Sequence, residues 1–369
     1  MREIKFSKPN ILKSDIKLVG KIIRSGWLTH GKFTRKFEDE FKKFTKSKYA
    51  LSVSSCTAGL HISCIASGFK KGDEIIVPAQ THTATAHAIE YTGAKAVFAD
   101  VEKFTGNISL EEIKKNYNKK TKGVIIVHMA GYPCDLPSIV KFCKQKKLVL
   151  LEDCAHAVGT KYKNKHVGNF GLTGSFSFYP TKQITTGEGG MIVTNDKKTF
   201  DRIKKLKAFG IDKDIKDRKR QGDYDVKSLG YNYRMTDFQA ALGISQIMNF
   251  KKNLKKRHIL AKRYLSNFSQ IKDIKCMPYS SDCSYFVFQV FCKKRNKILQ
   301  ELKRLHIGVS VHYANPLHKM SYYRNKYKLN NMKYKNSINY GLENISLPVY
   351  PKLKISEVDK ICKIITKLL

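Results

Sequence analysis

Apolar residues in this chain form short runs that alternate with longer segments of helical periodicity. A short apolar run bounded by polar residues, glycine or proline is typical of a buried parallel strand. Apolar residues spaced three and four apart predict amphipathic helices instead. The expected strands cover residues 49–55, 74–79, 94–101, 123–130, 148–153, 175–179 and 191–194. The expected helices cover residues 16–24, 33–44, 56–66, 110–117 and 136–146, and further helices open near residues 81 and 236.

This alternation predicts an α/β fold. Strands that alternate with helices are joined by right-handed crossovers and form a mostly parallel sheet covered on both faces. We expect a three-layer α/β/α large domain over residues 1–250. A Rossmann fold is disfavoured, because no Gly-x-Gly-x-x-Gly turn follows the first strand.

The remaining residues, 251–369, predict a smaller C-terminal α/β domain. Its expected elements are a linker helix over 250–268, strands over 284–291 and 309–313, and helices over 296–305 and 356–368. Residues 211–228 are polar and charged, and we expect them to form a surface loop near the substrate.

Composition argues against a membrane-spanning, a secreted or a disulfide-stabilised protein. No apolar run approaches the ~18 residues that suggest a membrane span, and the N-terminal residues lack the apolar core of a signal peptide. The nine cysteines are scattered without a Cys-x-x-Cys pair, which favours reduced thiols in the cytoplasm over disulfides or a metal site.

The charge is strongly positive, with 70 Lys and Arg against 30 Asp and Glu, a net +40. Nucleic-acid binding is one interpretation. However, the basic residues are dispersed over helical segments such as 251–257 and 293–297. We therefore favour solvated faces and do not expect a nucleic acid or a membrane as partner, although the charge can steer anionic substrates.

The candidate chemistry centres on Lys182. A strand-like run ends at Pro180, Lys182 follows, and a glycine-rich turn leads into the next strand at Met191. A lysine confined between two strands can form a Schiff base when desolvation lowers its pKa.

Asp153 is a possible partner for this lysine. It ends the buried run 148–153 and lies 29 residues before Lys182, at the carboxyl end of a strand, where open α/β sheets bind ligands. Pyridoxal 5'-phosphate (PLP) requires a lysine for its aldehyde and a carboxylate for its pyridinium nitrogen.

The stretch from Glu152 to His156, together with residues 175–190, resembles the DegT/DnrJ/StrS family of PLP-dependent nucleotide-sugar aminotransferases, which have fold type I. Segments 26–29, 54–58, 230–237 and 347–351 extend the resemblance over nearly the whole chain.

The resemblance implies a set of cofactor contacts. Lys182 is the expected catalytic and cofactor-binding residue, with Asp153 at the pyridinium nitrogen and His82 and His156 on the two faces of the ring. Phosphate contacts are expected from Thr57, Ala58 and Ser177. Asn232 of the partner subunit is also expected at the phosphate, with Arg234 as second choice. This last expectation implies a homodimer with shared active sites.

The resemblance also implies substrate contacts at Trp27, Thr29, His312 and Tyr313. The expected reaction moves an amino group, with L-glutamate as the donor, to a keto group of a nucleotide-linked deoxysugar. Two alternatives stay open: a PLP-dependent sugar dehydratase, although these relatives replace the lysine with histidine, and a regulatory or nucleic-acid-binding protein on the same fold.

Overall fold

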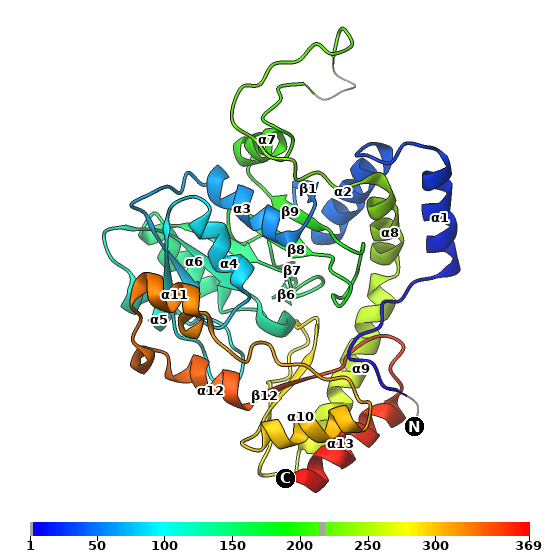
Figure 1. Cartoon of the computed structure of the whole chain (residues 1–369), viewed down its shortest axis with the longest axis vertical. Helices are drawn as coiled ribbons and strands as arrows, with labels where there is room; N and C mark the ends of the chain where they lie inside the picture. Colours follow the sequence, from blue (N-terminus) through cyan, green and yellow to red (C-terminus); the bar gives the residue numbers. More distant parts are fainter. Residues whose placement is uncertain (1–2, 214–217) are drawn as a thin grey trace.

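A computed structural model describes residues 3–213 and 218–369 of the chain. Its main feature is a seven-stranded sheet with the order β1-β9-β8-β5-β4-β2-β3, in which only β9 runs antiparallel to its neighbours (Figure 1). The strands are β1 (Tyr49–Val53), β2 (Glu74–Pro78), β3 (Lys95–Ala99), β4 (Thr121–Val127), β5 (Val149–Asp153), β8 (Thr173–Ser177) and β9 (Gly190–Thr194).

Helices cover both faces of this sheet. Alternate strand residues point to opposite faces, so Ile75 and Val77 of β2 pack under one helical layer while Ile76 packs under the other. One layer contains α3 (Cys56–Ala66), α4 (Thr83–Glu90) and α7 (Lys197–Leu206). The other contains α2 (Lys32–Thr45), α5 (Leu110–Asn116), α6 (Leu136–Gln145) and α8 (Asp237–Met248). The predicted three-layer α/β/α fold with a mostly parallel sheet is confirmed.

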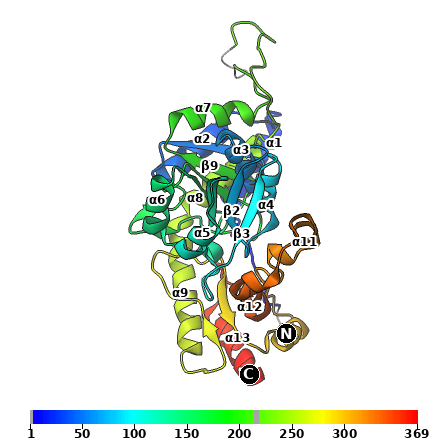
Figure 2. The same ribbon diagram turned by 90° about the vertical axis from the view of Figure 1, so that its left-hand side faces the viewer.

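A second, three-stranded antiparallel sheet follows the long helix α9 (Phe250–Phe268) in the chain and lies beside it in the lower part of the molecule in Figures 1 and 2. It contains β10 (Lys275–Cys276), β11 (Phe288–Phe291) and β12 (Asn344–Leu347). Helices α10 (Arg295–Arg304) and α13 (Ile355–Leu368) share one apolar core with this sheet and α9. The chain start joins this part through a bridge between Ile4 and Ile307. The domain boundary at residue 250 stays a prediction.

The remaining elements are short or lie outside the two sheets. They are α1 (Lys13–Arg24), the hairpin β6 (Lys161–Tyr162) and β7 (Lys165–His166), α11 (Ser321–Tyr327) and α12 (Lys335–Glu343). Short 3₁₀ turns lie at η1 (Met129–Gly131), η3 (Leu317–Lys319) and η4 (Asn331–Lys333).

Two predicted strands differ from the structure. The strand expected over 309–313 is wrong: this segment has only an isolated bridge between Ser310 and Ser346. The strand expected over 284–291 begins only at Phe288. Its first half cannot pair as a strand, because the Tyr285 and Phe286 carbonyls accept hydrogen bonds from Arg257 and Tyr285 has a φ of +46°.

The expected surface loop over 211–228 is described in part. Residues 211–213 and 218–228 form no helix or strand and extend away from the sheet beyond α7 (Figure 1). Residues 214–217 lie outside the described part of the chain. Across the described residues, no helix is both long enough and apolar enough to cross a bilayer.

Candidate active site

Lys182 lies in the turn between β8 and β9, at the carboxyl edge of the main sheet. Its backbone N–H donates to the Tyr179 carbonyl at 2.9 Å, which anchors the turn. Its half-buried side chain carries Nζ to 4.4 Å from the centroid of the Phe286 ring. Burial lowers the pKa of Lys182 to about 8, while the nearby Asp153 carboxylate acts in the opposite direction. A substantial share of this amine is therefore neutral near physiological pH.

Asp153 is the last residue of β5 and is 3 % exposed. Its Oδ1 accepts a hydrogen bond from the Ala155 N–H at 3.0 Å, and its Oδ2 accepts one from Thr85 Oγ1 at 2.8 Å. Burial raises the pKa of this carboxyl, although both hydrogen bonds oppose the shift. Within the described residues its hydrogen-bond partners are all neutral, so this carboxylate fits a cationic ligand group such as the pyridinium of PLP.

Two histidines near Lys182 are withdrawn from solvent: His156 is buried and His312 is half-buried. His156 stacks on Phe286 with ring centroids 4.4 Å apart. Its Nδ1 accepts from the Ala130 N–H at 3.4 Å, which leaves Nε2 to donate to Tyr313 Oη at 3.3 Å. Burial moves the pKa of His156 well below its usual range and that of His312 to about 3. Both rings are therefore neutral at physiological pH.

His82, His312 and Tyr313 complete this group of rings. His82 is exposed and forms the N-cap of α4, with its Nδ1 accepting from the Ala84 N–H at 3.2 Å. Its ring centroid lies 5.7 Å from that of Tyr313. His312 lies 5.9 Å from His156, centroid to centroid, and its Nδ1 pairs with Ser346 Oγ at 2.9 Å.

The predicted phosphate contacts lie around the start of α3. Ser55 caps this helix by accepting from the Ala58 N–H at 3.1 Å, and Thr57 and Ala58 line a cavity of about 420 Å³. Ser177 ends β8, where it pairs with Gly190 of β9. A Cβ on Gly190 would lie 2.7 Å from the Cys56 nitrogen, so only glycine allows β9 to approach the helix start this closely. A helix N-terminus flanked by hydroxyls fits a phosphate group.

Four of the predicted site residues, Trp27, Thr29, Asn232 and Arg234, lie apart from Lys182 and the residues around it within a single chain. Trp27 is 52 % exposed and donates from Nε1 to the His30 carbonyl, and Thr29 Oγ1 pairs with the His30 ring. Asn232 accepts at Oδ1 from Arg234 Nε at 3.0 Å on the surface.

Arg234 also lines a cavity of about 1130 Å³ between α2, α7 and the segment after α7. None of the other predicted site residues contributes to the wall of this cavity.

Three residues of the site were not predicted from the sequence: Thr85, Cys56 and Phe286. Thr85 lies three residues after His82, on the same side of α4, and this spacing was a usable signal. Cys56 donates from Sγ to the Ser175 carbonyl at 3.4 Å; it lies in the matching segment 54–58, but a cysteine at the start of a helix indicates no role by itself. Phe286 reaches the site from a part of the chain more than 100 residues beyond Lys182.

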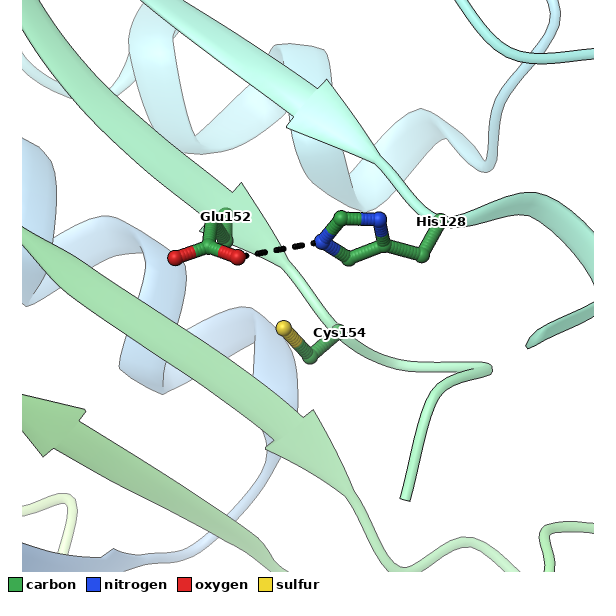
Figure 3. A group of neighbouring side chains, drawn as sticks. All are labelled: His128, Glu152 and Cys154. Atoms are coloured by element: carbon green, nitrogen blue, oxygen red, sulfur yellow. Dashed lines mark hydrogen bonds and ion pairs between the residues drawn. The ribbon is translucent and has the colours of Figure 1, made fainter. Parts of the chain in front are cut away.

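A second buried cluster, His128, Glu152 and Cys154, has the residue types of a metal site (Figure 3). However, Glu152 already accepts four hydrogen bonds, from His128 Nε2 at 3.1 Å and from the N–H groups of Gly168, Phe170 and Gly171 at 2.7 Å each. His128 Nδ1 accepts from the Cys134 N–H at 3.2 Å. With these lone pairs in use, the cluster is a hydrogen-bond network and not a set of free ligands.

This network lowers the pKa of Glu152. Burial alone would raise that pKa, but the hydrogen bonds from His128 and from the backbone outweigh it. Since Glu152 directly precedes Asp153, the network also helps to hold the end of β5 in place.

Comparison with known proteins agrees with this geometry. The sequence model of the DegT/DnrJ/EryC1/StrS aminotransferase family matches residues 9–366. The chain is 37 % identical to the spore coat polysaccharide biosynthesis protein SpsC of Bacillus subtilis, over 96 % of this chain and 94 % of that protein. It is 35 % identical to GDP-perosamine synthase of Escherichia coli O157:H7, over 100 % and 99 %.

Solved structures give the same result. The Helicobacter pylori aminotransferase PseC, involved in the biosynthesis of pseudoaminic acid, superposes with a TM-score of 0.93 at 30 % identity, covering 100 % of this chain and 99 % of PseC. The PLP-form of the putative sugar aminotransferase Spr1654 from Streptococcus pneumoniae superposes with a TM-score of 0.92 at 28 % identity, covering 100 % of both chains. The chain belongs to the DegT/DnrJ/EryC1/StrS family of PLP-dependent sugar aminotransferases.

Proposed function

We propose that this enzyme transfers an amino group from L-glutamate to a keto group of a nucleotide-linked deoxysugar. The observation that carries the proposal is that Lys182 and the Asp153 carboxylate, which among the described residues accepts hydrogen bonds from neutral groups only, lie together at one edge of the sheet, next to the start of α3. The name of GDP-perosamine synthase supports a nucleotide-linked sugar, and that of SpsC supports a role in polysaccharide synthesis. We place the reaction in the cytoplasm.

The cofactor would be held by groups from several elements. Lys182 would form the covalent attachment and Asp153 would face the pyridinium nitrogen. Bound PLP would supply an electron-accepting ring that stabilises negative charge on the carbon next to the transferred nitrogen. The remaining contacts would come from His82 and His156 at the ring and from Thr57, Ala58 and Ser177 at the phosphate.

Lys182 has the proton affinity that a general acid and base requires. A pKa of about 8 lies close to physiological pH, where a group can both accept and return a proton efficiently. Once the amino donor has taken its place, the free Lys182 amine would take a proton from the donor carbon that bears the transferred nitrogen. The same amine would later give a proton back.

The substrate sugar would lie against His312 and Tyr313. Burial raises the pKa of Tyr313, so its hydroxyl stays protonated and can donate a hydrogen bond to a sugar oxygen. The neutral His312 ring places no second positive charge beside Lys182.

We propose that two copies of the chain share their active sites. Asn232 is exposed in a single chain, and the segment that holds it is anchored at the end of β1, where the Ser54 N–H donates to the Tyr233 carbonyl at 2.9 Å. In a homodimer, Asn232 of the partner subunit would complete the phosphate site, with Arg234 beside it. Trp27 and Thr29 would contribute to the substrate site in the assembled dimer.

Lys182→Ala tests the reaction directly. Reduction with borohydride and mass spectrometry should find PLP attached to Lys182 in the wild-type enzyme and nowhere in the variant, which should also lose turnover. Lys198→Ala, on the exposed surface of α7, is the matched control. An active Lys182→Ala enzyme would contradict the proposal.

Nitrogen tracing separates the aminotransferase from a sugar dehydratase. With L-glutamate labelled with ¹⁵N on its amino group, an aminotransferase places the label in the sugar, whereas a dehydratase does not. The presence of lysine at position 182, where the dehydratases have histidine, favours label transfer.

A further inference from the structure

The Phe286 ring forms one wall of the site, and no substrate or cofactor contact assigned above involves it. The ring lies parallel to His156, with the centroids 4.4 Å apart and the planes at 21°. The Lys182 amine lies 4.4 Å from the same ring centroid. His312 packs against Phe286 edge-on, with the centroids 5.4 Å apart. One ring therefore contacts the reactive lysine and two of the histidines around it.

The backbone of Phe286 is held from both sides. On one side, the N–H groups of Ser284 and Phe286 donate to the carbonyls of Gly131 and Ala130, at 3.1 and 3.0 Å. On the other side, Arg257 of α9 donates from one guanidinium nitrogen to the carbonyls of Tyr285 and Phe286, at 2.9 and 3.3 Å.

Tyr285 shows that this arrangement is imposed by its surroundings. Its φ of +46° lies in the left-handed region, which is unfavourable for a residue with a large side chain. Such a conformation persists only where neighbouring contacts determine it, and it is concentrated at functional sites. Here the hydrogen bonds from Arg257 to the Tyr285 and Phe286 carbonyls help to hold Tyr285 in this conformation.

Arg257 is itself an unusual residue. It is 2 % exposed, and its hydrogen bonds go to carbonyls only, the third being that of Val349. Burial lowers the pKa of its guanidinium to about 9. A buried cation without a carboxylate partner among the described residues is costly, which argues that its contacts with the backbone serve a purpose beyond simple packing.

Several other groups act on the Lys182 amine. Asp153 at the end of β5 favours its charged form, whereas burial raises the pKa of the Cys56 thiol of α3 well above its usual range and keeps that thiol neutral. His82, His156 and His312 approach from three other segments, but the last two are neutral. Arg257 is not among the groups that shift Lys182. Among the described residues, Phe286 is the aromatic side chain whose π face lies under the Lys182 amine and can stabilise its ammonium form.

We propose that Phe286 is a positioning residue for Lys182, whose ring holds the ammonium form of the free amine beside the reacting carbon, and that Arg257 acts through Phe286 by fixing its backbone. The inference rests on the proposed role of Lys182 as the group that carries the proton. Phe286 and Arg257 would then be two residues from the C-terminal part of the chain that support an active site at the edge of the main sheet.

The test is the titration of Lys182 in the full-length protein after the cofactor has been removed. Trace acetylation with acetic anhydride across a pH series, followed by mass spectrometry of the peptide that contains Lys182, gives the midpoint of this single amine. Loss of a cation–π contact in Phe286→Leu should lower this midpoint by about 0.4 to 1.5 pH units. Phe286→Tyr keeps a ring and should preserve it.

Phe288→Leu is the matched control. Phe288 is a buried phenylalanine of the same core, stacked on Tyr264 at 5.1 Å and not on the site. This variant should lose comparable packing and leave the Lys182 midpoint unchanged. If Phe286→Leu also leaves the midpoint unchanged, or if Phe288→Leu shifts it equally, the proposal is overturned.

Arg257→Met tests the second half of the proposal by the sign of its effect. Simple removal of a distant positive charge would raise the Lys182 midpoint, whereas displacement of Phe286 would lower it. We expect a lower midpoint, and no further shift when Arg257→Met is added to Phe286→Leu. A raised midpoint, or a full additional shift in the double variant, would overturn the role of Arg257. If Arg257→Met does not fold, Arg257→Lys is measured in its place. Because this variant retains the charge, a lower Lys182 midpoint again indicates displacement of Phe286.

The labelling requires no cofactor and no substrate. Its outcome is therefore independent of whether the enzyme proves to transfer amino groups to a nucleotide-linked sugar.

Discussion

Replacement of Asp153 by asparagine should weaken cofactor binding without lowering the stability of the cofactor-free protein. Asparagine keeps the local hydrogen bonds: its Oδ1 can accept from the Ala155 N–H, and its amide can donate to the Thr85 hydroxyl, which can in turn donate to Thr81 Oγ1. What the variant loses is the negative charge opposite the pyridinium nitrogen. A hydrogen bond to a charged group contributes about 1.5–3 kcal/mol, so we expect PLP to dissociate about 10- to 150-fold more readily.

The stability of the cofactor-free protein should not fall in this variant. Burial raises the pKa of Asp153, so the folded protein binds the proton more tightly than the unfolded chain does. This contribution favours the folded state at low pH and is lost as the pH rises through the folded-state pKa. At neutral pH the ionised Asp153 therefore destabilises the cofactor-free protein, and Asp153→Asn should leave its free energy of unfolding unchanged or higher.

Equilibrium dialysis of PLP and urea unfolding of the cofactor-free protein measure these two quantities separately. The reasoning fails if Asp153→Asn binds PLP as tightly as the wild-type enzyme. It also fails if weaker binding is accompanied by an equal loss of stability, since the residue would then be structural.

Two further predictions concern the surroundings of the site. Glu152→Gln should lower the free energy of unfolding in urea by about 3 kcal/mol, because the glutamine amide would oppose backbone N–H donors that the carboxylate now accepts. Added zinc or EDTA should leave the wild-type unfolding temperature unchanged, and a clear rise with zinc would contradict our interpretation of the cluster in Figure 3. For the shared site, randomly mixed Lys182→Ala and Asn232→Ala subunits should regain activity at about one quarter of all sites. Activity no higher than that of the unmixed variants would place Asn232 in its own chain's site.

Much of the fold could be predicted because its strands are buried on both faces. Short apolar runs such as 74–79 and 148–153 mark β2 and β5 closely, and helix α9 has the bounds that its periodicity predicts. The placement of Asp153 and Lys182 at the same edge of the sheet could be predicted as well, because Asp153 ends β5, Lys182 lies in the turn after β8, and parallel strand ends meet at one edge.

Other features depend on contacts that a single segment does not contain. Residues 284–287 have the alternating pattern of a strand. However, the carbonyls of Tyr285 and Phe286 accept hydrogen bonds from Arg257, which lies on a helix more than 25 residues earlier in the chain. The segment 309–313 also has a strand-like pattern, yet only Ser310 bridges to a neighbour. The approach of Phe286 to Lys182 likewise arises only when the C-terminal part packs against the main sheet.

The central claim is that the enzyme moves an amino group through PLP held at Lys182. The most direct measurement is the visible absorption spectrum of the purified enzyme, supplied with PLP, before and after the addition of L-glutamate. The account predicts a yellow protein whose visible band disappears with L-glutamate and returns with a nucleotide-linked keto sugar. A protein that stays colourless with PLP, or a yellow protein whose band persists with every amino donor, would contradict it.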